Sequence, residues 1–237
     1  MTRPHLLLRL EAPLMAFGAV AVDAYGPVQD IPSPSLLTGL LGNALGWDRA
    51  ETDRLDALQE RITLAARRDR QGERFEDFQT AQLAADDQGW TTWRRPEGRD
   101  GGAATYNSPH IRRRWFDADA AVTVALRLDP PAAAPTLEAL AAALDRPARP
   151  LFLGRKPCLP AGRIVIGIVA AANCLAALDG APWAEDSGAK ARLFWPEGEA
   201  PASRAPHRLH GYRRWRSGVH AGEGLWWEGE VANPNPA

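Results

Sequence analysis

A long interruption in the apolar pattern, from Gln71 to Arg114, constrains the fold more than any other feature of the sequence. Glycine, asparagine and proline break the periodicity there, and polar residues fill the gaps between them. A structureless insertion of this length would be unusual inside a compact domain. We therefore predict a projecting hairpin or mobile arm, with Phe75–Leu83 and Ile111–Phe116 as its two legs.

Regular patterns flank this arm on both sides. Apolar runs predict strands, and apolar residues at three- and four-residue spacing predict helices. The predicted order is a strand at His5–Leu10, helices at Leu36–Trp47 and Thr52–Glu60, a strand at Ile62–Ala66, the arm, a strand at Asp119–Leu128, a helix at Thr136–Leu144 and a strand at Arg163–Ala170. This α+β order is close to a split β-α-β, ferredoxin-like sheet, which is also the frame of RNA-recognition modules. Late strand candidates lie at Arg192–Trp195 and Leu209–Trp215.

The overall charge limits where a nucleic acid could bind. The 237 residues carry 28 lysines and arginines against 29 aspartates and glutamates, a formal net charge of −1, so any such site must be a local patch. The two cysteines make neither a disulfide framework nor a zinc set. The sequence shows no signal-peptide layout and no apolar run of membrane length, which predicts a soluble, cytoplasmic protein that contacts no membrane.

One basic and aromatic stretch, Pro150–Pro160, contains no acid. If its centre is extended, Phe152, Gly154 and Lys156 share one face. The ring could then stack under a base, and the ammonium group about 13 Å away could meet a phosphate, with Gly154 leaving room for a nucleic-acid backbone. The alternative is a proline-bounded turn in which Phe152 is a core residue and the cations are solvated.

Glycines mark a second segment. Gly39, Gly42 and Gly46 share one face of the predicted helix, where an interior glycine costs about 1 kcal/mol relative to alanine. Close approach of an RNA backbone would offset that cost, although tight packing on the sheet is the commoner cause.

The returning leg of the arm is the third basic segment. It carries three successive arginines, Arg112 to Arg114, followed by Trp115 and Phe116, a mixture that suits nucleic-acid binding. Surface ion pairing would explain the same arginines equally well, because the arm also carries acids at Glu76, Asp77, Asp86 and Asp87.

Catalytic motifs are scarce. The chain has no nucleotide-binding loop and no serine-nucleophile motif, and His207 and His210 have no third ligand nearby, so we expect no metal and no other cofactor. A metal-independent endoribonuclease needs a base, an acid and a cation at the scissile phosphate. Tyr25, His110 and Lys156 could supply these groups, but nothing in the sequence links them.

Four separated motifs together resemble one protein family. They are His5–Gly18 with Pro32–Gly42 after it, then Asp119–Leu126, and then Phe152–Cys158. This set resembles the CasD family of the RAMP superfamily, the subunits that hold the 5′ handle of the guide RNA (crRNA) in the type I-E CRISPR surveillance complex, Cascade. The resemblance implies a ferredoxin-like (RRM-like) palm at residues 1–70 and 116–170 and an inserted β-hairpin thumb at 71–115. The late strand candidates predict a C-terminal β-rich extension at 171–227, and the final Asn-Pro-Asn-Pro-Ala predicts a disordered tail at 228–237.

The same resemblance implies a function. It implies a non-catalytic RNA-binding subunit in antiviral defence, placed beside a CasC-like backbone subunit and a CasA-like large subunit, and meeting target DNA only through the complex. In another CRISPR subtype the related subunit cuts the precursor RNA, which keeps the ribonuclease alternative open. Arg114 would hook the handle, and Phe152 would stack on a base where the family often has tyrosine. The expected RNA-binding residues are Arg112, Arg113, Arg114, Phe152, Gly154, Arg155, Lys156, Ser35 and Gly39.

Overall fold

The computed structural model describes residues 2–82, 109–202, 206–220 and 222–236. Its helices are α1 (Pro34–Ala44), α2 (Thr52–Arg61), α4 (Leu137–Asp145) and α5 (Cys174–Asp179). Its strands are β1 (Arg3–Glu11), β2 (Leu14–Met15), β3 (Tyr25–Gly26), β4 (Ile62–Arg70), β5 (Glu73–Ala81), β6 (His110–Ala118), β7 (Ala121–Leu128), β8 (Val165–Ala171), β9 (Lys190–Pro196), β10 (His207–His210), β11 (Arg213–Arg214), β12 (Val219–His220) and β13 (Glu223–Ala232).

The main sheet contains seven strands in the order β10-β13-β9-β4-β7-β1-β8, and each strand is antiparallel to its neighbours. The four strands predicted on either side of the arm, β1, β4, β7 and β8, lie together in this sheet. The later strands extend the sheet from the edge of β4. The chain is therefore a mixed α+β protein built mostly of sheet, as its sequence predicts.

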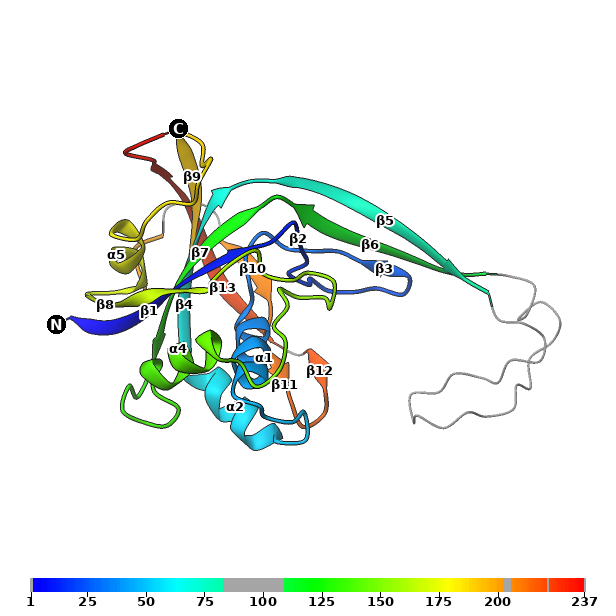
Figure 1. Cartoon of the computed structure of the whole chain (residues 1–237), viewed down its shortest axis with the longest axis horizontal. Coiled ribbons are helices and arrows are strands. Elements are labelled where there is room, and N and C mark those ends of the chain that lie inside the picture. Colours follow the sequence, from blue (N-terminus) through cyan, green and yellow to red (C-terminus); the bar gives the residue numbers. More distant parts are fainter. Residues whose placement is uncertain (1, 83–108, 203–205, 221, 237) are drawn as a thin grey trace.

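Alternation along β1 divides the apolar side chains between the two faces of the sheet. Leu6, Leu8 and Leu10 point into the larger core, which they share with α1, α2 and α4. Leu7 points into a smaller core beneath α5. Figure 1 shows α5 on its own, apart from the other three helices. The face covered by α1, α2 and α4 is the one that carries the candidate site described below.

The arm is a two-stranded ribbon. β5 and β6 pair antiparallel from Glu73↔Ala118 to Ala81↔His110, and β3 adds a short parallel pairing to β6. Figure 1 shows this ribbon leaving the main sheet and extending far beyond the helices. The predicted legs are confirmed as strands over residues 75–81 and 111–116, whereas Leu83, the predicted end of the first leg, lies outside the described residues. Asp86 and Asp87, which were candidate partners for the arginines of the arm, lie outside the described residues.

β4 runs to Arg70, past the predicted end at Ala66, because its arginines are buried and paired. Arg67 is 1% exposed and donates from its guanidinium to the Asp69 carboxylate and, at 2.8 Å, to the Leu178 carbonyl. A buried charge is tolerated only with such partners. These cations therefore hold the sheet together and are not available to a ligand.

Two expectations about the C-terminal part are wrong. Residues 228–232, assigned to a disordered tail, form the second half of β13, because they pair along β9 from Glu228↔Phe194 to Ala232↔Lys190. The strand predicted at Leu209–Trp215 is broken at Gly211, whose carbonyl accepts a 2.9 Å hydrogen bond from the Ser35 amide. None of the helices in the described ranges combines the length and the hydropathy of a membrane span.

Candidate RNA-binding groove

A groove of about 780 Å³ opens beside α1. We call it the α1 groove. One wall is the loop at residues 16–21, and another is the turn that carries Phe152, Gly154 and Arg155. One side of α1 forms the floor, through Ser35, Gly39 and Gly42 among others, and residues of the segment from Gly211 to Gly222 close the far side. Four regions that are distant in sequence therefore meet here.

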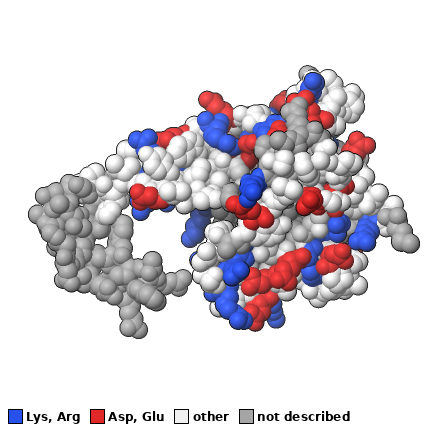
Figure 2. Space-filling view, turned by 180° about the vertical axis from the view of Figure 1, so that it is seen from behind, with Lys and Arg blue, Asp and Glu red and all other residues white. Residues whose placement is uncertain are grey.

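The lining of the α1 groove is positively charged. Four arginines line it, Arg49, Arg149, Arg155 and Arg213, together with the rings of Trp47, Phe152 and Trp215, and no aspartate or glutamate is among the lining residues. Of these arginines, Arg149 forms an ion pair with Asp48 beside the groove, at 2.8 Å. Elsewhere the charges are mixed, and Figure 2 shows basic and acidic side chains interspersed over the face that it presents. The net charge of −1 is thus compatible with a local basic patch, which is the arrangement that a single-stranded nucleic acid needs.

Phe152 lies on a turn and not on a strand. The Leu153 amide donates to the Cys158 carbonyl at 2.7 Å and the Cys158 amide donates to the Arg155 carbonyl at 2.9 Å, so the chain reverses between them. The extended conformation considered for this stretch is therefore wrong. Leu151, Leu153 and Cys158 are buried, whereas Phe152 is half-buried and faces the groove. The proline-bounded turn is the correct interpretation of the backbone, but Phe152 is not a sealed core residue.

Gly154 makes room for protein backbone. Its φ is +103°, and a Cβ at this position would lie 1.9 Å from the Ala16 carbonyl oxygen. The Ala16 amide donates to the Leu153 carbonyl at 3.1 Å, which fixes this close approach. The expectation that Gly154 leaves space for RNA is therefore wrong, because the loop at residue 16 occupies that space. Its indirect contribution is to set the turn that presents Phe152.

Arg155 joins the turn to the base of the arm. Its guanidinium donates to the Trp115 carbonyl at 2.8 Å and to the Gly26 carbonyl at 2.7 Å, and it lies 4.7 Å from the centre of the Phe116 ring. Burial lowers the pKa of Arg155, and the neighbouring Arg114 lowers this pKa further. The two carbonyls hold the Arg155 side chain in place. No carboxylate in the described chain forms an ion pair with it, so its positive charge is not neutralised.

The three successive arginines of the arm face two ways. Arg113 pairs with Glu76 at 3.0 Å and lies over Tyr25 and Phe78, at 5.9 and 5.4 Å from their ring centres. The ion-pair interpretation is thus confirmed for Arg113. Arg112 and Arg114 occupy the opposite face of the ribbon, since neighbouring residues of a strand alternate.

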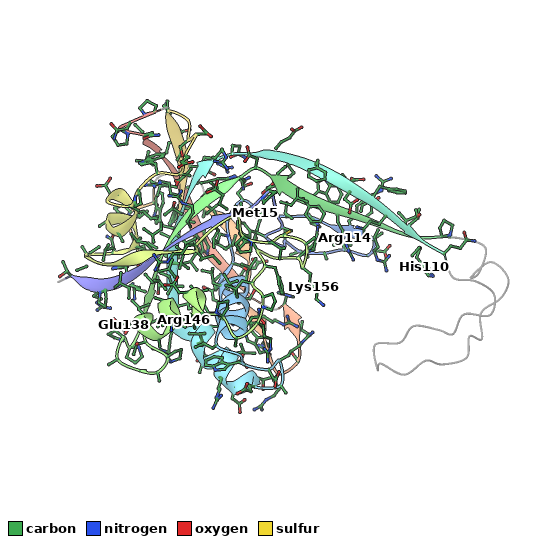
Figure 3. All side chains as sticks on the ribbon, viewed as in Figure 1. Met15, His110, Arg114, Glu138, Arg146 and Lys156 are labelled. Carbon is green, nitrogen blue, oxygen red and sulfur yellow. The ribbon has the colours of Figure 1, made fainter. Side chains whose placement is uncertain are left out.

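Arg114 and Lys156 are both exposed. Arg114 donates to the Gln79 side chain at 3.2 Å, and no acid in the described ranges forms an ion pair with it. In Figure 3, Arg114 lies part-way along the arm and Lys156 lies on the turn below it. The structure therefore brings Arg114, Arg155 and Lys156 into one region at the junction of arm and groove.

The glycines of α1 have three different roles. A Cβ on Gly39 would meet only the Trp215 ring, at 3.5 Å, whereas a Cβ on Gly42 would lie 2.8 Å from Leu55 of α2. Gly46 follows the end of the helix with φ at +78°. The expected packing of these glycines on the sheet is therefore wrong, because their neighbours are Trp215 for Gly39, Leu55 of α2 for Gly42 and Ala148 for Gly46. Ser35 is buried, and its hydroxyl lies 3.2 Å from that of Ser33, the N-cap of α1.

The three residues considered for ribonuclease chemistry are not gathered. His110 begins β6 at the far end of the ribbon, and Figure 3 shows it well away from Lys156. Tyr25 pairs opposite Arg113 and stacks on Trp115, with 6.1 Å between ring centres. Within the described ranges, no group of three or more histidine, cysteine, aspartate or glutamate side chains is arranged to hold a metal ion.

The profile of a family described as CRISPR-associated protein (Cas_Cas5) matches residues 5–224, which include every element that lines the groove. The chain belongs to the Cas5 family of CRISPR-associated proteins. Among curated proteins, the CRISPR system Cascade subunit CasD of Escherichia coli (strain K12) is 31% identical to this Cas5 protein over 156 residues, which span 66% of this chain and 67% of CasD.

Solved structures agree with the family assignment of this Cas5 protein. A chain of a CRISPR RNA-guided surveillance complex superimposes with a TM-score of 0.73 at 23% identity, covering 96% of this chain and 90% of that one. A structure described as a crystal structure of a Cas protein gives a TM-score of 0.59 at 24% identity, covering 96% and 94%. At such identities these two matches show a shared fold.

Sequence reasoning missed half of the groove in this Cas5 protein. Arg49, Arg149 and Trp47 were not singled out, and no role was assigned to Arg213 or Trp215. One signal was available: the segment from Ala200 to Ala221 contains five arginines, three histidines and no acid. The sequence does not show where this segment packs. In the fold it contacts the start of α1, where the Gly211 carbonyl accepts a hydrogen bond from the Ser35 amide.

Proposed function

We propose that this Cas5 protein is a subunit of a type I-E CRISPR surveillance complex (Cascade) and binds the 5′ handle of crRNA in the α1 groove without cutting it. The observation that carries the proposal is the lining of that groove, which combines arginines with an accessible Phe152 and contains no acid. Aromatic rings stack on unpaired bases, and cations meet the phosphates between them. The similarity to CasD, whose name describes a Cascade subunit, supports the same role.

The handle would enter where the arm meets the groove. Arg114 and Lys156 are exposed there, and neither forms an ion pair with an acid in the described chain. Phe152 lines the groove at the start of the turn that carries Lys156, and Gly154 fixes that turn against Ala16, so the ring is pre-positioned for stacking. Base stacking is worth about 1–3 kcal/mol per base and tolerates most sequences. The choice of a particular handle would then depend on hydrogen bonds to splayed bases.

The fold supports one further part of the proposal, the ferredoxin-like palm. The neighbouring strands β4-β7-β1-β8 are all antiparallel and have the connections expected of a ferredoxin-like palm. The ribbon of β5 and β6 would be the thumb and would lie across the guide strand. A CasC-like backbone subunit and a CasA-like large subunit would flank the protein in the cytoplasm, and target DNA would reach it only through the complex.

The separation of His110 from Lys156 (Figure 3) supports a non-catalytic role. A metal-independent ribonuclease needs its base, acid and cation around one phosphate. The test is to incubate the purified protein with repeat RNA in EDTA and to resolve the products on a gel. We expect intact RNA. Cleavage at one site in the repeat would establish the endoribonuclease alternative instead.

RNA binding is tested with two variants and two matched controls. Phe152→Ala removes the proposed stacking ring, and Leu159→Ala removes an apolar side chain that is 57% exposed on the same segment. Arg114→Ala removes the proposed hook, and Arg146→Ala removes an exposed arginine that Figure 3 places beside α4, away from the arm.

Fluorescence anisotropy with labelled repeat-derived RNA should show weaker binding for Phe152→Ala and Arg114→Ala, about tenfold each, and no change for the two controls. Thermal unfolding checks that all four proteins remain folded. Equal affinities for both test variants and both controls would refute the stacking role of Phe152 and the hook role of Arg114.

A further inference from the structure

A short hairpin at the far side of the α1 groove presents a second basic cluster. β11 (Arg213–Arg214) and β12 (Val219–His220) pair so that Arg213 is opposite His220 and Arg214 is opposite Val219. Opposite residues of a ribbon share a face and successive residues alternate. Arg213 and His220 therefore face the groove together, and both line it. Arg214 lies on the other face and is exposed.

Arg49 completes this cluster from the loop that precedes α2. The terminal nitrogens of Arg213 and Arg49 lie 3.5 and 3.6 Å from one point, the position that a Cβ on Gly218 would occupy. Two guanidinium groups thus converge beside the hairpin turn. No described carboxylate forms an ion pair with either of them. Burial and then Arg49 lower the pKa of Arg213, and burial and then Arg213 lower the pKa of His220.

The nearby acids of α2 are used to position the hairpin. The Asp56 carboxylate accepts a 3.1 Å hydrogen bond from the Trp215 amide, and Asp53 pairs with Arg216 at 3.0 Å. Gln59 clamps the backbone of Arg213 from both sides, accepting from its amide at 3.1 Å and donating to its carbonyl at 2.9 Å. The backbone of the cluster is therefore fixed before any ligand arrives, while its guanidinium groups keep their charges.

We propose that Arg49, Arg213 and His220 form a second phosphate-binding site, which holds a backbone phosphate of the single-stranded RNA in the α1 groove. This inference rests on the proposed function and adds a second point of contact with the RNA. Figure 1 shows the hairpin of β11 and β12 beside α1, separated from the arm and β3. An RNA bound at both places would be gripped near the arm and again at the hairpin. Converging guanidinium groups suit a phosphate, since each offers parallel N–H donors to its oxygens.

The experiment compares Arg213→Gln and Arg49→Gln with Arg214→Gln. All three remove one positive charge, but Arg214 is on the opposite face of the same hairpin. Affinity for labelled repeat-derived RNA is measured by anisotropy at several salt concentrations, using the full chain. We expect about a tenfold loss for the first two variants and a salt dependence that is flatter by about 0.7 in log–log slope for each lost phosphate contact. Arg214→Gln should match the unmodified protein.

Two outcomes keep this inference separate from the proposed function. If Phe152→Ala weakens binding but Arg213→Gln and Arg49→Gln behave like Arg214→Gln, the second phosphate site is refuted and the groove stands. If the two cluster variants weaken binding and Phe152→Ala does not, the cluster stands and the stacking role is refuted. Arg213 also lies 5.0 Å from the centre of the Trp215 ring, so its substitution could loosen the hairpin. Among the described residues Arg49 has no such ring contact, and its variant must show the same effect.

Discussion

Gly154→Ala tests whether the turn beside the groove is shaped by protein contacts. A non-glycine residue with positive φ costs about 1–3 kcal/mol, and φ here is +103°. The added Cβ would also lie 1.9 Å from the Ala16 carbonyl oxygen, so the two backbone segments must separate. That movement loosens the 3.1 Å hydrogen bond from the Ala16 amide to the Leu153 carbonyl, worth about 0.5–1.5 kcal/mol.

The expected loss in the free energy of unfolding is therefore roughly 2–4 kcal/mol. For a chain of this size each kcal/mol shifts the Tm by about 2–4 °C, so Gly154→Ala should lower the Tm by roughly 5–15 °C. Thermal unfolding without RNA measures this directly. Gly162→Ala is the matched control, because its added Cβ has no atom of the described residues within 4 Å other than those of its chain neighbours. If both variants had the Tm of the unmodified protein, the close approach of Ala16 would be wrong, and Gly154 would again be free to face RNA.

Two further predictions concern stability. Gly39→Ala should raise the free energy of unfolding by up to about 1 kcal/mol, because the new methyl group meets only the Trp215 ring at an ordinary 3.5 Å; a clear drop in Tm would contradict this. Burial alone would raise the pKa of Glu199, but the Cys174 amide and the Arg127 guanidinium outweigh it and hold the pKa below the ordinary 4.5. The carboxylate is therefore stabilising above pH 4.5, and this contribution should be lost as the pH falls towards the pKa of the folded state. Chemical denaturation across that range should show a weaker pH dependence for Glu199→Gln, and identical slopes would refute the assignment.

Local patterns predict the sheet and the arm because each depends on neighbours in sequence. The alternation in β7 and the spacing in α4, with Thr136 as its N-cap, leave little choice of structure. The failure of periodicity after Gln71 similarly marks the ribbon. Local patterns do not show which strand will pair with the edge of a sheet. For this reason β13 was not predicted as a strand, and its residues from 228 onwards, which pair with β9, were assigned to a disordered tail.

The groove is less predictable because its residues are neighbours only after folding. Phe152 and Arg155 could be identified from composition, but their geometry depends on the Ala16 carbonyl and on the carbonyls of Gly26 and Trp115. The same composition fitted an extended strand, which the structure excludes. In the sequence Arg49 stands between the acids Asp48 and Glu51, which suggests an ordinary charged surface loop. Only the hairpin at Gly218 brings it to Arg213.

The way in which arginines are anchored explains how a chain with a net charge of −1 keeps a basic groove. On the sheet and the arm, arginines such as Arg67 and Arg113 are neutralised by carboxylates. In the groove, Arg155 is held by two backbone carbonyls, which carry only partial charges and therefore fix the side chain without cancelling its field. A guanidinium group has five N–H donors, so it can donate to two carbonyls and still donate to a ligand. The ammonium group of lysine has three donors on a flexible stem and is less well suited to both tasks at once. The groove is thus basic because no acid lines it. Arginine serves there to position charge as well as to bind phosphate, which is a reason for its use in place of lysine.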